Sequence, residues 1–282
     1  MTAKKATVCH SEYDRLTRVI VAEPTYMAIT EVINETQKHF LSDNIDTKVA
    51  TDQHQAFVSV LKREGIEVDH LPVKDHLNEQ VFTRDIGFTL GQTLFIANMA
   101  SDIRKQETDI LTDVLNKDDT PFHPLTGPSI EGGDVLIDGK NIYIGVSERT
   151  THDAIDILKQ QLPDYDIYPL SLAGDILHLD CTFNIVSGTD ALIYRQGLTE
   201  EAVSLLEKRY NLIDVSADEQ FTLGTNVLSV GHKKVISLPN NEAVNKQLAD
   251  RGYHVIEVAF DEIIKSGGSF RCCTLPVVRV KD

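Results

Sequence analysis

The sequence predicts a single α/β domain in which a helix, a strand and a β-hairpin recur five times around an axis. Segments of helical periodicity recur at intervals of roughly 40 to 50 residues. A short β-type run follows each of them, and a pair of apolar runs joined by a turn comes next. With 282 residues, 41% of them hydrophobic, the chain can build a full core, and no Pro-, Ser- or Gly-rich linker divides it. We therefore expect one domain over residues 1–282.

The helical segments carry apolar residues at intervals of three and four. They span residues 53–63, 105–116, 152–161, 200–208 and 241–250. The strands that follow them span residues 66–68, 122–125, 166–170, 212–215 and 254–258.

Hairpins are expected at residues 88–96, 134–144 and 226–236, with Gly91 and Gly139 supplying turn conformations in the first two. The last unit, at residues 275–280, lacks a second strand. Residues 18–22 near the N-terminus have the composition to supply that strand and close a ring. The alternative to this cyclic arrangement is an ordinary open α/β sheet.

The formal net charge of −16 disfavours nucleic acid and anionic membranes as partners and suits a cationic small molecule. The polar start at Met1–Lys5 has no apolar signal core, and no run of 18 apolar residues follows. Four cysteines (Cys9, Cys181, Cys272 and Cys273) are too few for a disulfide framework, so a reduced, cytoplasmic setting is expected. The oligomeric state stays open, because an outer ring of helices is compatible with a homo-oligomer.

Polar residues occupy equivalent positions at the start of successive hairpins. Asp85 lies there in the first unit, Glu131 in the second, His178 and Asp180 in the third, and Cys272 in the fifth. In a cyclic repeat, equivalent positions meet at one end of the axis. We therefore expect a thiol, an imidazole and several carboxylates to share one pocket.

This set of side chains suits the chemistry of a guanidinium group. A guanidinium is planar, permanently charged and rich in N–H donors, so it needs in-plane acceptors such as Asp85 and Asp180. Its resonance-stabilised carbon requires a strong nucleophile, which a thiolate provides. One histidine can protonate the departing amine and later deprotonate water. Glu131 would contact the substrate or orient the imidazole, and no metal or organic cofactor is required.

Four motifs together resemble the guanidine-modifying superfamily of dimethylarginine dimethylaminohydrolases, arginine deiminases and glycine amidinotransferases. They are Phe-Thr-Arg-Asp ending at Asp85, Glu-Gly-Gly-Asp-Val from Glu131, His-Leu-Asp from His178 and Gly-Gly-x-x-Arg-Cys-x-Thr-x-Pro around Cys272. The resemblance runs from residue 79 to residue 279, with the motifs in the family's order. It implies the pentein fold, a pseudo-fivefold αβ-propeller, which agrees with the repeat count.

The resemblance also implies roles for these residues. It selects Cys272 over Cys273 as the nucleophile, and it makes His178 the general acid and base, accompanied by Glu131. It places Asp85 against the guanidinium of the substrate.

Three further positions outside the catalytic motifs can be compared with the family. Arg104 and Arg149 match arginines that hold a substrate carboxylate in the dimethylarginine hydrolases. Glu79 occupies a position that is usually Asp or Asn, and its role is left open.

The expected activity is hydrolysis of arginine or an N-methylated arginine to citrulline, through a thiouronium adduct on cysteine. Chain length favours the dimethylarginine hydrolase type, whereas Asp180 favours an unmethylated guanidine, because a dimethylated nitrogen has no N–H to donate. Amidino transfer to an amine and non-catalytic binding of a guanidino compound are the alternatives. A zinc site built on His178, Cys181 and the Cys272–Cys273 pair lacks the usual Cys-x-x-Cys spacing, and we expect no metal.

Overall fold

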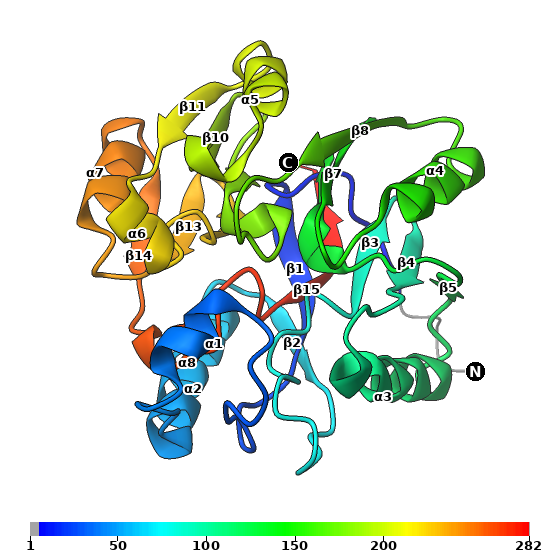
Figure 1. The fold of residues 1–282 in the computed structure, drawn as a ribbon, viewed down its shortest axis with the longest axis vertical. Helices are drawn as coiled ribbons and strands as arrows, with labels where there is room; N and C mark the ends of the chain where they lie inside the picture. Colours follow the sequence, from blue (N-terminus) through cyan, green and yellow to red (C-terminus); the bar gives the residue numbers. More distant parts are fainter. Residues whose placement is uncertain (1–5, 282) are drawn as a thin grey trace.

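The computed structural model describes residues 6–281, so the predicted polar start at residues 1–5 lies outside the described chain. Five three-stranded sheets are arranged around a common centre, with the longer helices on the periphery (Figure 1). The sheets are β15(Leu275–Val280)–β1(Arg15–Val21)–β2(Glu67–His70), β3(Gly87–Leu90)–β4(Thr93–Ile96)–β5(Phe122–Pro124), β6(Val135–Asp138)–β7(Asn141–Val146)–β8(Asp166–Ser171), β9(Phe183–Ile185)–β10(Asp190–Ile193)–β11(Asn211–Asp214) and β12(Leu228–Gly231)–β13(Lys234–Ser237)–β14(His254–Glu257).

In each sheet the first two strands are antiparallel, and a helix then leads to a third strand that is parallel to the second. The five connecting helices are α2(Thr47–Arg63), α3(Lys105–Lys117), α4(His152–Gln161), α5(Glu200–Glu207) and α7(Glu242–Asp250). The expected unit placed each strand with the hairpin that follows it in the sequence, and this assignment was wrong. Each strand after a helix joins the preceding hairpin, because parallel neighbours require a crossover connection, which the helix supplies.

Helix α2 begins at Thr47, earlier than the expected residue 53. The reason is an N-cap: the Asp46 side chain accepts hydrogen bonds from the backbone N–H groups of Lys48 and Val49. Three short helices were not expected at all: α1(Glu35–Phe40), α6(Ala217–Phe221) and α8(Asp261–Ile264).

The expected pairing of residues 18–22 with the last unit, at residues 275–280, is confirmed. Strand β1 pairs antiparallel with β15, with Ile20 opposite Leu275. A buried ion pair between Glu12 and Arg271, 2.5 Å from Oε2 to Nη1, adds a second link between the two ends of the chain. The C-terminal strand is therefore held in a fixed position, and so are the residues just before it.

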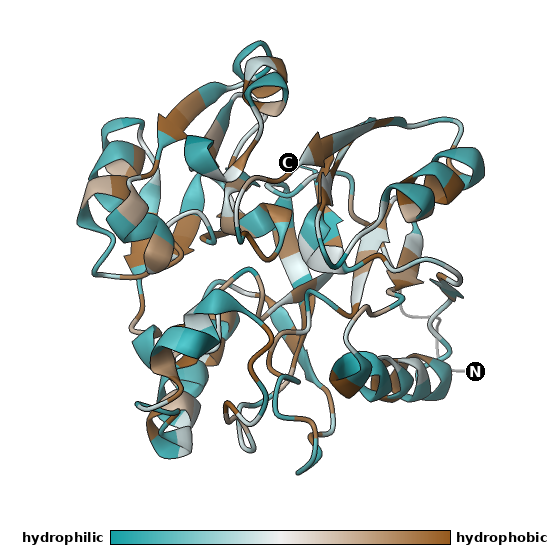
Figure 2. Ribbon diagram, viewed as in Figure 1, coloured by the Kyte–Doolittle hydropathy of each residue, from teal (hydrophilic) through white to brown (hydrophobic). Residues whose placement is uncertain are grey.

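Apolar side chains fill the space between each sheet and its outer helix. In the β3–β4–β5 sheet, Leu94 and Ile96 pack in one buried cluster with Leu111 and Leu115 of α3. Figure 2 shows hydrophobic residues gathered on the strands, whereas the outer helices present many hydrophilic residues. Across residues 6–281, no helix is both long and apolar enough to cross a membrane.

Candidate active site

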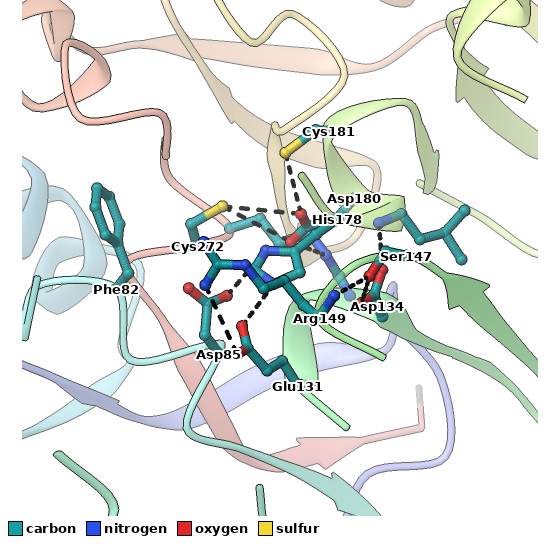
Figure 3. A network of polar contacts seen from close by, with 12 residues as sticks. Phe82, Asp85, Glu131, Asp134, Ser147, Arg149, His178, Asp180, Cys181 and Cys272 are labelled. Atoms are coloured by element: carbon teal, nitrogen blue, oxygen red, sulfur yellow. Dashed lines mark hydrogen bonds and ion pairs between the residues drawn. The ribbon is translucent and has the colours of Figure 1, made fainter. Parts of the chain in front are cut away.

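The residues at the starts of the hairpins converge at the centre of the molecule. Glu131 and His178 each precede a short 3₁₀ turn, Gly132–Asp134 before β6 and Leu179–Cys181 before β9. Cys272 lies just before β15. Figure 3 shows Asp85, Glu131, His178 and Cys272 turned toward one another.

A cavity of about 10 Å³, room for a single water molecule, lies at this convergence. The candidate site residues on its wall are Glu79, Asp85, Arg104, Arg149, His178 and Cys272. A guanidino amino acid cannot enter a space of this size. Segments 33–34 and 266–268 also line the cavity.

The His178 imidazole is held between two carboxylates. Its Nε2 lies 2.8 Å from Glu131 Oε2, and its Nδ1 lies 3.5 Å from Asp85 Oδ1. Burial alone would lower the pKa of His178, but Asp85, the Glu131 hydrogen bond and Asp134 outweigh it and raise that pKa to about 10. At neutral pH His178 is therefore an imidazolium, the form that can donate a proton.

Glu131 is held in the charged form that His178 needs. Burial would raise the pKa of Glu131, but the hydrogen bond and charge of His178 outweigh it, and the pKa is lowered. Glu131 Oε1 also accepts the backbone N–H of Ala100 at 3.0 Å, and Arg149 Nη1 lies 3.8 Å from it.

One carboxylate oxygen of Asp85 accepts no hydrogen bond in the described structure. Its Oδ2 is paired with Arg104 Nη1 at 2.5 Å, whereas its Oδ1 is buried and makes no hydrogen bond in the described structure. A buried carboxylate oxygen without a donor is unfavourable, so this atom is suited to accept an N–H from a bound ligand.

The two arginines expected to hold a substrate carboxylate differ in their surroundings. Arg104 contacts Asp85 and also pairs with Glu107 at 2.8 Å, so a substrate carboxylate would compete with two carboxylates of the chain. Arg149 Nη2 donates to the backbone oxygen of Ile33 at 2.7 Å. Carboxylate binding by either arginine stays a prediction.

Cys272 lies on the cavity wall, and Asp180 lies behind it. The Cys272 Sγ is 3.8 Å from both Asp180 carboxylate oxygens. Asp180 does not line the cavity; its Oδ2 lies 3.3 Å from Arg271 Nε. Burial raises the pKa of Asp180, although Arg271 and His178 partly offset that effect. The expected contact between Asp180 and the substrate stays a prediction.

Cys273 is placed differently from its neighbour. It is fully buried and does not line the cavity. Burial and the nearby Cys272 raise the pKa of Cys273 well above its usual value. A protonated thiol that does not reach the cavity cannot attack a bound substrate, so the geometry favours Cys272 as the nucleophile.

Several residues that hold the site together were not expected. Gln37 of α1 donates to Glu79 Oε1 at 2.8 Å, and Ser266 donates to the same carboxyl. Burial raises the pKa of Glu79 to about 7, against the lowering effect of Arg104. Gln37 and Ser266 lie outside the repeated motifs, and the sequence contains no signal for them.

The place of Asn226 in the site was not predicted, although its position in the repeat indicated it. Its Oδ1 accepts the backbone N–H of Cys272 at 3.2 Å, and its Nδ2 donates to the Asp180 backbone oxygen at 3.2 Å. Asn226 begins the fourth hairpin, and it is therefore the equivalent of the residues that were identified in the other four units.

Gly133 gives the imidazole its space. A Cβ at this position would lie 2.7 Å from His178 Nδ1 and 2.8 Å from Asp85 Oδ1.

We expect Gly133→Ala to displace His178 and to lower kcat roughly 10- to 100-fold. Gly139→Ala is the control: a Cβ there meets no atom within 4 Å, but φ is +63°. That variant should lose roughly 1 kcal/mol of stability and keep its kcat, as thermal unfolding and steady-state rates would show. Equal kcat losses in both would contradict the steric account.

Among residues 6–281, one group of ligand-type side chains is close enough to surround a cation: Asp85, Glu131 and His178, whose ligand atoms lie within 4.8 Å of one another. A metal ligand must be a neutral imidazole, whereas the pKa of His178 is raised to about 10. The donor set therefore fits a protonated histidine better than a metal, and the absence of a metal stays a prediction.

Comparisons with known proteins fit this geometry. The family model described as N,N dimethylarginine dimethylhydrolase, eukaryotic, matches residues 23–279. The uncharacterized protein YkgA of Bacillus subtilis (strain 168) is 52% identical over 273 residues, which cover 97% of this chain and 96% of the relative.

Two solved structures share the fold. The N-terminal domain of ArgZ, an arginine dihydrolase of the ornithine–ammonia cycle in cyanobacteria, has a TM-score of 0.86 at 23% identity, covering 94% of this chain and 98% of that one. A variant of that domain was solved covalently bonded to a reaction intermediate. SxtG, an amidinotransferase of saxitoxin biosynthesis in Microseira wollei, has a TM-score of 0.85 at 19% identity, covering 97% of each chain.

The structural likenesses establish the fold, and the family model matches most of the chain. The chain belongs to the N,N-dimethylarginine dimethylhydrolase family, within the guanidine-modifying superfamily.

Proposed function

We propose that this protein hydrolyses a guanidinium compound, arginine or an N-methylated arginine, to citrulline and ammonia or an amine. One observation carries the proposal. The Cys272 thiol, the His178 imidazolium and the unsatisfied Asp85 Oδ1 line the same cavity. They are a nucleophile, a proton donor and a guanidinium acceptor, the three groups that this reaction needs.

The first half of the proposed reaction forms a covalent adduct. As the cationic substrate binds, Cys272 releases its thiol proton to the surrounding water, favoured by the positive charge of the substrate, and its sulfur adds to the guanidinium carbon. Asp85 Oδ1 accepts a substrate N–H and holds the group in plane. His178 donates its proton to the departing nitrogen, the C–N bond breaks, and a thiouronium remains on sulfur.

The second half returns the enzyme to its starting state. The neutral His178 takes a proton from water, and the water oxygen adds to the same carbon. The C–S bond then breaks, the thiolate of Cys272 takes the hydroxyl proton of the adduct, and the neutral ureido product leaves Cys272 as a thiol. Glu131, 2.8 Å from His178 Nε2, keeps the imidazole oriented through both proton transfers.

A panel of substrates tests this proposal. The protein is incubated with arginine, methylarginines, agmatine and guanidinoacetate, and both ureido product and released amine are measured. We expect ureido product from at least one of them. Methylarginines that are poorer substrates than arginine would indicate that Asp85 Oδ1 needs an N–H on the nitrogen facing it.

Amidino transfer is the second candidate, favoured by the fold shared with the SxtG amidinotransferase. It predicts that an added amine acceptor gains the amidino group and that ureido product is absent. Failure with every compound, together with no labelling of Cys272 by a haloacetamidine, would contradict both reactions and favour a guanidino-binding protein.

We also infer that the five sheets form a pseudo-fivefold αβ-propeller and that residues 1–282 make up one catalytic domain. The common topology of the sheets and the closing pair β1–β15 support this arrangement. The free thiols of Cys9, Cys181, Cys272 and Cys273 support a reducing, cytoplasmic setting.

A further inference from the structure

Cys181 is a second thiol beside the nucleophile, and the proposed reaction gives it no role. Its Sγ lies 3.7 Å from Asp180 Oδ1, and the Cys272 Sγ lies 3.8 Å from the same oxygen. The Cys272 thiol also raises the pKa of Cys181, as expected for two neighbouring thiols. Figure 3 shows both sulfur atoms directed at the Asp180 carboxylate. Two cysteines far apart in the sequence thus meet at one buried atom.

The two sulfur atoms face different spaces. Cys272 lines the 10 Å³ cavity, which excludes a guanidino amino acid and has room for one water molecule. Cys181 borders a separate cavity of about 620 Å³, which Ile176 and Gln220 also line. Hydrogen peroxide is larger than water but far smaller than a guanidino amino acid, so a small widening of this cavity gives it access to Cys272 when substrate is absent. Cys181 lies beside the same Asp180 carboxylate.

We propose that Cys181 is the resolving cysteine of Cys272 and that a peroxide converts the pair into a reversible disulfide. In the first step the Cys272 sulfur attacks a peroxide oxygen, the O–O bond breaks, and a sulfenic acid and water form. In the second step the Cys181 sulfur displaces the sulfenic hydroxyl as water, and the S–S bond forms. The peroxide is reduced by two electrons, which the two thiols supply.

The surroundings of Cys181 suit a resolving thiol. The neighbouring Cys272 thiol, together with burial, raises the pKa of Cys181 well above its usual value. Cys181 therefore stays protonated, and it does not compete for substrate or oxidant while Cys272 is reduced. Oxidation of Cys272 replaces the neighbouring thiol and so removes one of these two causes of the raised pKa. The disulfide then protects the nucleophile, because a sulfenic acid left alone is oxidised further and irreversibly.

Peptide mass spectrometry after peroxide treatment tests this directly. Trypsin places Cys181 in the peptide 160–195 and Cys272, with Cys273, in the peptide 272–279. We expect these two peptides to be cross-linked in the wild type and in Cys273→Ala, and separated again by dithiothreitol. In Cys181→Ala the cross-link should be absent, and Cys272 should be recovered as sulfinic acid.

Two results would overturn the proposal. One is an absent cross-link with equal sulfinic acid at Cys272 in the wild type and Cys181→Ala. The other is a disulfide confined to the peptide 272–279. Because the cross-link is read without any substrate, its absence would leave the proposed hydrolysis untouched. Once a substrate is identified, activity gives a second measurement. Peroxide-treated wild type should regain its activity in dithiothreitol, whereas peroxide-treated Cys181→Ala should stay inactive.

Discussion

Replacing Cys272 by serine is expected to abolish turnover, with kcat lowered by at least roughly 10³-fold. A hydroxyl is a far weaker nucleophile than a thiolate, and it would need a base to take its proton. His178 cannot serve as that base at neutral pH, because its pKa is raised to about 10 and it already carries a proton. Ureido product formed over time at saturating substrate measures the loss.

Cys273→Ala is the matched control for this variant. Cys273 follows Cys272 in the chain, but it is fully buried and does not line the cavity. The alanine variant should keep its kcat and lose roughly 1 kcal/mol of stability, because a small void replaces the sulfur. Normal activity in Cys272→Ser, or a comparable loss in Cys273→Ala, would mean that the nucleophile has been misassigned.

Glu131→Gln is expected to lower kcat roughly 10²- to 10⁴-fold and to shift the alkaline limb of the pH profile. The wild type needs protonated His178, so its activity should fall only as pH rises through about 10. Glutamine removes the negative charge that stabilises the imidazolium at 2.8 Å, and the pKa of His178 falls. The loss of activity at high pH should therefore begin at a lower pH than in the wild type, as kcat measured across the alkaline range would show.

Glu262→Gln removes a carboxylate away from His178 and serves as the control. Glu262 is also buried, but it accepts the backbone N–H of Asp46 and does not line the cavity. Its kcat and its alkaline limb should match those of the wild type. If kcat of Glu131→Gln falls at the same alkaline pH as kcat of the wild type, another group sets the protonation state of His178.

Much of the fold was predictable because the long elements are periodic. Helices such as Lys105–Lys117 show their buried face in the spacing of apolar residues, and residues 18–22 stood out as an unpaired strand. Helices α1, α6 and α8 were not predictable, because six residues or fewer do not establish a helical period. Sheet membership was also missed, because periodicity identifies a strand and not its partner.

The site was predictable to the extent that the repeat is regular. Asp85, His178 and Cys272 meet because they occupy equivalent positions, and Asn226 meets them for the same reason. The directions of the side chains were not predictable. Asp180 lies within a 3₁₀ turn that directs its carboxylate to Arg271 and away from the cavity wall.

Arg104 was not fully predictable either. It is the N-cap residue of α3, and its side chain pairs with Glu107 in the first turn of that helix. The start of the helix was predicted at residue 105, but the start alone does not give the direction of the Arg104 side chain.

Mass spectrometry of the acid-quenched enzyme tests the central claim, a covalent adduct on Cys272, most directly. Glu131→Gln mixed with arginine and quenched during turnover should gain the mass of arginine less ammonia. The added mass should lie on Cys272 of the peptide 272–279. An adduct carrying only the amidino group would indicate transfer chemistry. Turnover without any adduct, or an adduct on Cys273, would contradict the account.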